Sequence, residues 1–320
     1  MIFLKKPLII LTGPTAVGKT KLSISLAQAV NGAIISADSM QVYRHMDIGS
    51  AKIRPEEMCG VPHYLIDVLD PSEEFHVVKF VELAHEAMEK IYAAGQIPIV
   101  TGGTGFYIQA LLKEVDFTES HGELPIRKEL EEKAATVYGA AELYQKLSEV
   151  DPASAETIHP NNVKRVIRAL EYYYETGQKI SEHNEEQKQK ESPYCSAYFV
   201  LNDERSILYD RIDRRVDQMI CDGLVDEVFR LKEMGYTRDL VSMQGLGYKE
   251  LFPYLAGECT LEEAVYIIKR DTRHFAKRQL TWFRREKDVI WLNKPDFEYD
   301  DTKILTYMMD VLQAKGILPA

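Results

Sequence analysis

The segment Gly13-Pro14-Thr15-Ala16-Val17-Gly18-Lys19-Thr20 decides the fold, because it fits the pattern G-x-x-x-x-G-K-[ST] at every fixed position. It comes directly after the apolar run Leu8–Leu11, which reads as a strand, and it opens a helical pattern that continues to Val30. A strand before the motif and a helix after it form the context that this pattern requires. We therefore predict a loop whose backbone N–H groups surround a phosphate group at the start of a helix.

Lys19 and Thr20 give this loop its chemistry. The lysine supplies a full positive charge, and the threonine supplies a hydroxyl for Mg²⁺. A chance glycine-rich turn would explain the glycines, but it would have no use for a lysine and a threonine at these positions. The motif does not say whose phosphates it binds, because a nucleoside triphosphate and a prenyl pyrophosphate present similar oxygens.

Strand and helix patterns alternate on either side of this loop. We predict a second strand at Ala33–Ala37, a third at Tyr64–Val68, a helix at Phe75–Ala94 and a further strand at Ile97–Thr101. Such alternation is typical of a parallel sheet covered by helices. The predicted fold class is therefore α/β, a P-loop NTPase-like parallel sheet core flanked by helices.

The pattern changes in the middle of the chain. From 116 to 193 the sequence is polar and helix-forming, with few β-branched runs, which predicts a mainly α-helical insertion domain. Strand character returns at Cys195–Leu201 and again at Val289–Leu292. We therefore divide the chain into an α/β catalytic core, residues 1–115 and 194–320, and an insertion, residues 116–193.

The composition is that of an ordinary globular protein, with 45% hydrophobic residues among 320. No stretch approaches the ~18 apolar residues of a transmembrane helix, and the first residues lack the features of a signal peptide. We expect a cytoplasmic protein, a monomer, with no membrane partner. The four cysteines are widely spaced and form no Cys-x-x-Cys pair, which is typical of free thiols.

The net charge of −11, taken alone, argues against a nucleic acid partner. The distribution of charge argues differently, because eight Lys or Arg lie between Lys269 and Lys287 against only Asp271 and Glu286. A basic face can occur on an acidic protein. A salt-bridged surface helix would show the same pattern, and this alternative stays open at the level of sequence.

Asp38 follows the second predicted strand and should lie at the carboxyl edge of the sheet, where α/β sites form, facing the phosphate loop. Its structural interpretation is a turn or helix cap. Its functional interpretation is a carboxylate that accepts a proton from a nucleophile or holds a metal's water. The turn Gly102-Gly103-Thr104 follows another strand of the same sheet, so Thr104 is a second candidate at that edge, although a tight turn alone would also explain the glycines.

Five segments together resemble one family, the tRNA dimethylallyltransferases, or isopentenyltransferases, of the bacterial type. They occur in that family's order and roughly its spacing, and they read GPTAVGKT, ISADSMQVYRHMDIGSAK, VTGGTGFYIQALL, HPNNVKRVIRALE and QLTWFRR. The match spans nearly the whole chain. The first segment alone is generic, whereas the five together are highly specific.

The resemblance implies a reaction. A dimethylallyl group passes from dimethylallyl pyrophosphate to the exocyclic N6 amine of the adenosine immediately 3′ of the anticodon in tRNA, and pyrophosphate is released. The phosphate loop would hold the pyrophosphate with Mg²⁺, Asp38 would remove the amine proton, and Thr104 would lie beside the adenosine. An arginine would contact the pyrophosphate, and Arg211 and Arg215 are the competing candidates, with Arg215 slightly favoured.

The resemblance also implies contacts with the anticodon stem-loop of tRNA. These come from the segment after the second strand, from Thr104, from the start of the insertion and from one helix within it. The residues concerned are Asp38, Ser39, Met40, Gln41, Thr104, Arg127, Lys164, Arg165, Val166, Ile167 and Arg168. Without the resemblance, the basic side of that helix would be read as an ordinary solvated face.

Two other classes of function compete with this reading. In a P-loop small-molecule kinase or NTPase, Asp38 would activate a hydroxyl or water and the insertion would be a lid. That alternative explains the phosphate loop but not the basic segments of the insertion and of residues 269–287. A non-catalytic RNA-binding protein would have no reason for a complete phosphate loop facing a carboxylate.

Overall fold

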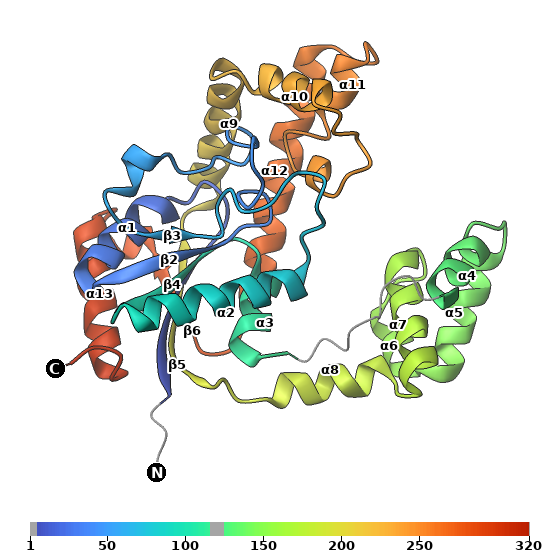
Figure 1. The fold of residues 1–320 in the computed structure, drawn as a ribbon, viewed down its shortest axis with the longest axis horizontal. Coiled ribbons are helices and arrows are strands. Elements are labelled where there is room, and N and C mark those ends of the chain that lie inside the picture. Colours follow the sequence, from blue (N-terminus) through green and yellow to red (C-terminus); the bar gives the residue numbers. More distant parts are fainter. Residues whose placement is uncertain (1–4, 116–124, 320) are drawn as a thin grey trace. The chain divides into compact units, whose positions relative to one another are not determined.

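One parallel β-sheet forms the centre of the structure, a computed structural model that describes residues 5–115 and 125–319. Within these residues six strands pair in the order β3-β2-β4-β1-β5-β6 (Figure 1). Their bounds are β1 Lys6–Thr12, β2 Gly32–Ala37, β3 His63–Tyr64, β4 Ile97–Gly102, β5 Tyr194–Asn202 and β6 Val289–Asn293. The predicted α/β fold with a parallel sheet is confirmed.

Helices surround this sheet and form a second compact body. Those of the sheet-containing part are α1 Lys19–Val30, α2 Val77–Ala93, α3 Gly105–Lys113, α9 Arg205–Cys221, α10 Leu224–Glu233, α11 Leu251–Leu255, α12 Leu261–Phe283 and α13 Asp301–Ala314. The others are α4 Pro125–Ala134, α5 Gly139–Val150, α6 Pro152–Thr157, α7 Val163–Thr176 and α8 Ile180–Gln189. None of the helices in the described part of the chain is both long and apolar enough to span a membrane.

Strand β1 is buried on both faces, which explains its unbroken apolar sequence. Leu8 and Ile10 join the core that α2 and α3 cover, whereas Ile9 and Leu11 join the core that α1 and α13 cover. The strand lies between β4 and β5, in the interior of the sheet. The loop that follows β1 therefore emerges at the middle of the sheet's carboxyl edge, where the neighbouring strands lead to opposite sides.

The third strand is much shorter than predicted. It comprises only His63 and Tyr64, so the prediction for Leu65 to Val68 was wrong. Leu65 and Asp67 adopt left-handed backbone conformations, with φ of 63° and 56°, which a strand does not allow. The backbone N–H of Val68 donates to the carbonyl of Val42, so this segment pairs with the loop after β2 instead.

The chain divides into two compact units, one of Met1–Leu112 with Pro193–Ala320 and one of Lys113–Ser192. The second unit corresponds to the insertion expected at 116–193, of which residues 116–124 lie outside the described residues. It is helical and has its own apolar core, built around Leu143, Leu147 and Leu170.

Candidate active site

The phosphate loop runs from the end of β1 to the start of α1. Ala16 and Gly18 have left-handed backbone conformations, with φ of 63° and 99°. Among the described residues, no protein acceptor takes the backbone N–H groups of Ala16, Val17 and Gly18. Unpartnered N–H groups at a helix N-terminus form an anion-binding nest. The fold thus leaves the loop ready for a phosphate group, as the motif predicts.

Lys19 supplies the ammonium group of this loop. Its Nζ donates hydrogen bonds to the carbonyls of Gly13, at 2.9 Å, and Pro14, at 2.8 Å. Burial, and then the nearby Arg215, lower the pKa of Lys19 to about 8, while Asp38 acts in the opposite direction. These electrostatic effects mean that the lysine, the arginine and the carboxylate share one small site.

The two candidate arginines differ in their partners, although both line the same cavity. The Nη1 of Arg211 pairs at 2.6 Å with Asp203, whose side chain is fully buried. In the described residues Arg215 has no hydrogen-bond or ion-pair partner, and burial lowers its pKa. A half-buried guanidinium without an ion-pair partner, attracted only through space by Asp38, favours Arg215 as the residue that meets an anionic ligand.

Asp38 caps a turn with one carboxylate oxygen and leaves the other oxygen without a partner in the described residues. Its Oδ1 accepts hydrogen bonds from the backbone N–H groups of Met40, at 2.8 Å, and Gln41, at 3.4 Å, so it does cap a turn. Its Oδ2 has no hydrogen-bond partner within the described residues, and the side chain lines the cavity. The turn around Thr104 lies next to it, because the Thr104 N–H donates to the carbonyl of Ala37 at 3.3 Å. Thr104 itself does not belong to the cavity wall.

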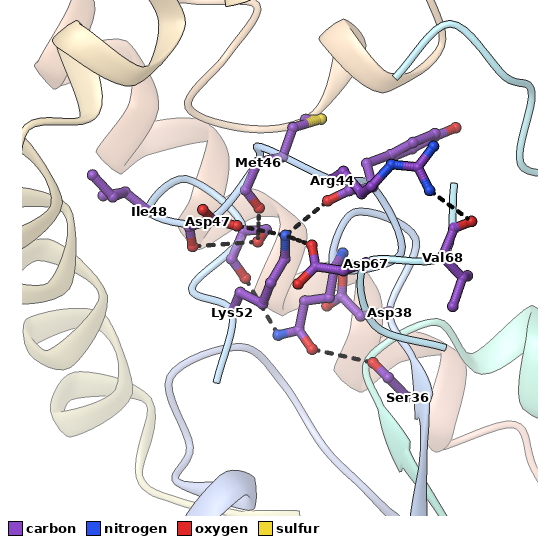
Figure 2. A network of polar contacts seen from close by, with 12 residues as sticks. Ser36, Asp38, Arg44, Met46, Asp47, Ile48, Lys52, Asp67 and Val68 are labelled. Carbon is purple, nitrogen blue, oxygen red and sulfur yellow. Dashed lines mark hydrogen bonds and ion pairs between the residues drawn. The ribbon is translucent and has the colours of Figure 1, made fainter. Parts of the chain in front are cut away.

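Polar contacts brace the loop that carries Asp38 (Figure 2). The side chain of Lys52 is only 5% exposed and pairs with Asp47, at 2.6 Å, and Asp67, at 2.5 Å. The amide of Gln41 accepts from Ser36 Oγ at 3.1 Å and donates to backbone carbonyls later in the loop. These bonds tie the start of the loop to its end, and so they fix the direction in which Asp38 points.

A buried carboxylate from α10 fixes the same loop from another side. The Oε2 of Glu227 accepts from the backbone N–H of Ile48 at 2.8 Å, and its Oε1 accepts from Gly49 at 3.1 Å and from the Tyr248 hydroxyl at 2.7 Å. The candidate residues selected from the sequence do not include Glu227. The helical spacing of positions 224, 227, 228 and 231 could have indicated it, because the apolar Leu224, Val228 and Leu231 place Glu227 on the buried face of α10. Ser39 is half-buried and Met40 packs against the core, so the segment predicted to contact tRNA is firmly held.

One cavity of about 330 Å³ connects these groups. Its lining includes the cations Lys19, Arg211 and Arg215 and a set of apolar side chains. The larger apolar side chains are Ile34, Ile53, Ile66 and Phe275. Gln279 also lines the cavity, and its role was not anticipated, although it stands in the predicted family segment QLTWFRR. The arrangement suits a small ligand with an anionic head and an apolar tail.

The predicted tRNA-binding residues of the helical unit fall into three groups. Lys164 and Arg165 are exposed and have no ion pair in the described part of the chain. Arg168 and Arg127 both approach the buried Glu171, at 2.9 and 3.6 Å.

Val166 and Ile167 differ from their charged neighbours in burial. Their side chains are only 1% and 5% exposed, and they pack in the core of the helical unit. A contact of these two residues with RNA would therefore involve their backbone, and their assignment to tRNA binding stays a prediction. The helical period explains the difference, because positions 164, 165 and 168 turn outward while 166 and 167 turn inward.

The fold and the site together define a P-loop enzyme of the α/β class, with a carboxylate opposite the phosphate loop. Comparison with known proteins gives the family. The model of the IPP transferase family matches residues 41–286, and that of isopentenyl transferase matches residues 6–74. The chain belongs to the IPP transferase family, which confirms the resemblance inferred from the five segments.

Individual relatives agree with this assignment. The chain is 65% identical to a tRNA dimethylallyltransferase of Lachnoclostridium phytofermentans, over 98% of this chain and 99% of that protein. It is 49% identical to one of Acetivibrio thermocellus, over 97% and 98% of the two chains.

Solved structures are also similar. A full-length tRNA isopentenylpyrophosphate transferase from Bacillus halodurans matches with a TM-score of 0.73 and 46% identity, over 98% of each chain. A eukaryotic dimethylallyltransferase described as acting on tRNA matches with a TM-score of 0.79 and 33% identity, over 95% of this chain and 78% of that one.

The pKa of Lys19 gives a test of the phosphate loop. With a pKa of about 8, Lys19 is mostly charged near neutral pH and mostly neutral at about one unit above that pKa. Since an anion binds the charged form, the contribution of Lys19 to pyrophosphate affinity should fall as pH rises through about 8. Calorimetric titration of inorganic pyrophosphate into the wild type and Lys19→Met should show an affinity ratio that declines over this range.

The ratio of the two affinities removes the ionisation of pyrophosphate itself, which is common to both proteins. A ratio that stays constant across the range would show that Lys19 does not change charge there or does not contact the anion.

Proposed function

We propose that this protein transfers a dimethylallyl group from dimethylallyl pyrophosphate to the N6 amine of the adenosine immediately 3′ of the anticodon in tRNA, releasing pyrophosphate. The observation that carries the proposal is the single cavity, in which a cationic phosphate loop, a carboxylate and isoleucine side chains meet. The relatives support it, because proteins named tRNA dimethylallyltransferase match this chain over nearly its whole length.

The cavity fits the donor better than it fits a nucleoside triphosphate. At about 330 Å³ it is near the lower end of the range for small-molecule pockets. The unpartnered N–H groups of the loop, with Lys19 and Arg215, take the pyrophosphate, while Ile34, Ile53 and Ile66 offer apolar surface to a five-carbon tail. The same wall also carries polar side chains, including Ser36, Gln41 and His63, so the presence of the isoleucines, and not a lack of polar groups, favours the prenyl donor over a nucleotide.

The chemical step is a displacement at the first carbon of the donor. The N6 amine of adenosine attacks that carbon, an N–C bond forms, and the C–O bond breaks with its electron pair leaving on pyrophosphate. Asp38 takes the amine proton on Oδ2, because Oδ1 is occupied by the turn. Charge develops on the leaving group, where preorganised N–H donors and the two cations stabilise it most.

Mg²⁺ fits this donor set as a partner of the pyrophosphate. The described residues contain no cluster of three or more histidine, cysteine or carboxylate ligands. The Thr20 hydroxyl lines the cavity at the start of α1, and Asp38 lines it as well. Such a sparse set suits Mg²⁺, which keeps several waters and binds through one or two protein groups together with substrate phosphates. When bound, it would neutralise charge on the leaving pyrophosphate.

RNA recognition is assigned to the exposed cations and to the loop after β2. Lys164 and Arg165 offer charge to phosphates, and Arg127 and Arg168 add two guanidinium groups oriented by Glu171. The target adenosine must leave its stack to reach the site, which costs a few kcal/mol. Thr104 and the Asp38–Gln41 segment then lie beside the extruded base. We place this activity in the cytoplasm and assign it to a monomer.

The first test distinguishes the transferase from its P-loop rival. We expect that incubation with dimethylallyl pyrophosphate, Mg²⁺ and an anticodon stem-loop RNA adds one dimethylallyl mass to the RNA. An RNA with guanosine in place of the target adenosine should gain no mass. With ATP as the added compound we expect no phosphate release above background. Phosphate release stimulated by RNA, with no prenyl mass, would establish an NTPase instead.

Asp38→Asn tests the proton acceptor. The asparagine keeps an oxygen that can cap the turn at Met40 but loses the basic carboxylate, so the fold of the loop should survive. We expect turnover to fall about 10²–10⁴-fold at saturating RNA, with donor affinity changed little. Single-turnover measurements with mass analysis of the RNA give the rate. Turnover within about threefold of wild type would exclude Asp38 as the base.

The helical unit is tested by reversing the charge of Lys164 and Arg165 together. Arg168 is left intact, because reversing it would place a second carboxylate beside the buried Glu171. We expect weaker binding of the stem-loop and a salt dependence shallower by roughly 0.7–0.9 per lost phosphate contact. Lys146→Glu is the control, because it removes only a surface pair with Glu149. If the double variant kept both affinity and salt slope, this helix face would be ordinary solvated surface.

A further inference from the structure

We propose that Gln279 is a positioning residue, which fixes the phosphate loop against the Gly102–Thr104 turn and thereby sets the affinity for the donor. The inference rests on the proposed function. It gives α12, which also contributes Phe275 to the cavity wall, a polar role in the site.

The side chain of Gln279 joins two loops that are far apart in sequence. Its Oε1 accepts a hydrogen bond from the backbone N–H of Thr15 at 2.9 Å, and its Nε2 donates to the carbonyl of Gly103 at 3.0 Å. The residue is only 6% exposed and lines the cavity. A buried amide with both ends hydrogen-bonded holds one defined orientation, because any rotation would leave a buried polar atom without a partner.

The turn after β4 is shaped to receive this helix. A Cβ at Gly103 would lie 2.0 Å from Gln279 Nε2, and a Cβ at Gly105 would lie 2.2 Å from Trp282 Cδ1. Neither glycine has a left-handed φ, so close approach and not backbone conformation explains both. Gln279 and Trp282 are three residues apart and share one face of α12. Two consecutive contacts therefore seat the helix on the turn.

The bridge matters most when a ligand is bound. In the free loop, Lys19 also holds the carbonyls of Gly13 and Pro14. When Lys19 turns to a pyrophosphate those two bonds are lost. Within the described residues, the bond to Gln279 is then the remaining hydrogen bond of residues 13–18. It also occupies the Thr15 N–H, and so leaves the N–H groups of Ala16, Val17 and Gly18 for the anion.

Gln279→Leu removes both hydrogen bonds while keeping a side chain of similar size. We expect the Kd for inorganic pyrophosphate to rise about tenfold, with the Kd for an anticodon stem-loop changed by less than about twofold. General destabilisation would instead lower the fraction of protein that binds without raising the Kd of that fraction, so calorimetric stoichiometry separates the two cases. Thr281→Ala is the control, because this exposed residue of α12 bonds only the Lys277 carbonyl of its own helix.

Gly103→Ala breaks the same bridge from the other side, since its Cβ displaces the Gln279 amide. We expect it to raise the Kd for pyrophosphate similarly, and we expect the double variant to be no weaker than either single variant. Additive losses, or a Kd for Gln279→Leu within about twofold of wild type, would overturn the positioning role while the proposed function stands. A wild-type protein that does not bind pyrophosphate would overturn both.

Discussion

Backbone N–H groups that the fold leaves without acceptors are the constraint on which the rest of the site depends. The sheet places the loop after β1 where the connections of neighbouring strands lead to opposite faces of the sheet. In the described structure, the backbone N–H groups of Ala16, Val17 and Gly18 have no protein oxygen as acceptor. An anion can accept from all three together. The positions of Lys19, Arg215 and Asp38 follow from that requirement, because cations stabilise the anion and the carboxylate has to stand where the nucleophile enters.

Helix α12 shows how an acidic protein keeps a basic surface. Near its middle, Lys269 and Arg273 form ion pairs with Asp217 and Asp213 of α9, so their charges are balanced within the protein. Near its C-terminal end and just beyond it, four cations are exposed and have no ion pair in the described residues; they are Lys277, Arg278, Arg284 and Arg285. The salt-bridged interpretation therefore holds for the first part of the basic segment, whereas the second part leaves its charges exposed. A net charge of −11 says little about a local field that decays within about 10 Å.

Much of the architecture followed from sequence, because the phosphate loop and the apolar strands are local patterns. The prediction of the third strand was wrong because Leu65 and Asp67 adopt left-handed backbone conformations. Neither residue is a glycine, so the sequence gives no sign of these conformations. Arg211 and Arg215 are one helical turn apart and line the same cavity. They differ in that Arg211 forms an ion pair with Asp203, which only the structure shows. Gln279 meets Thr15 across 264 positions of the chain, and a local pattern contains no information about that contact.

The resting position of Lys19 has a consequence for the end of the catalytic cycle. Its ammonium group is already solvated by the two carbonyls of Gly13 and Pro14. An arriving pyrophosphate displaces these carbonyls, and a departing one gives them back. Binding therefore exchanges two existing hydrogen bonds of the ammonium group for contacts with the anion. The net contribution of Lys19 to affinity is smaller than the full electrostatic attraction for this reason. Product release is easier than the number of cations around the loop suggests, which favours turnover in an enzyme whose product is a multiply charged anion.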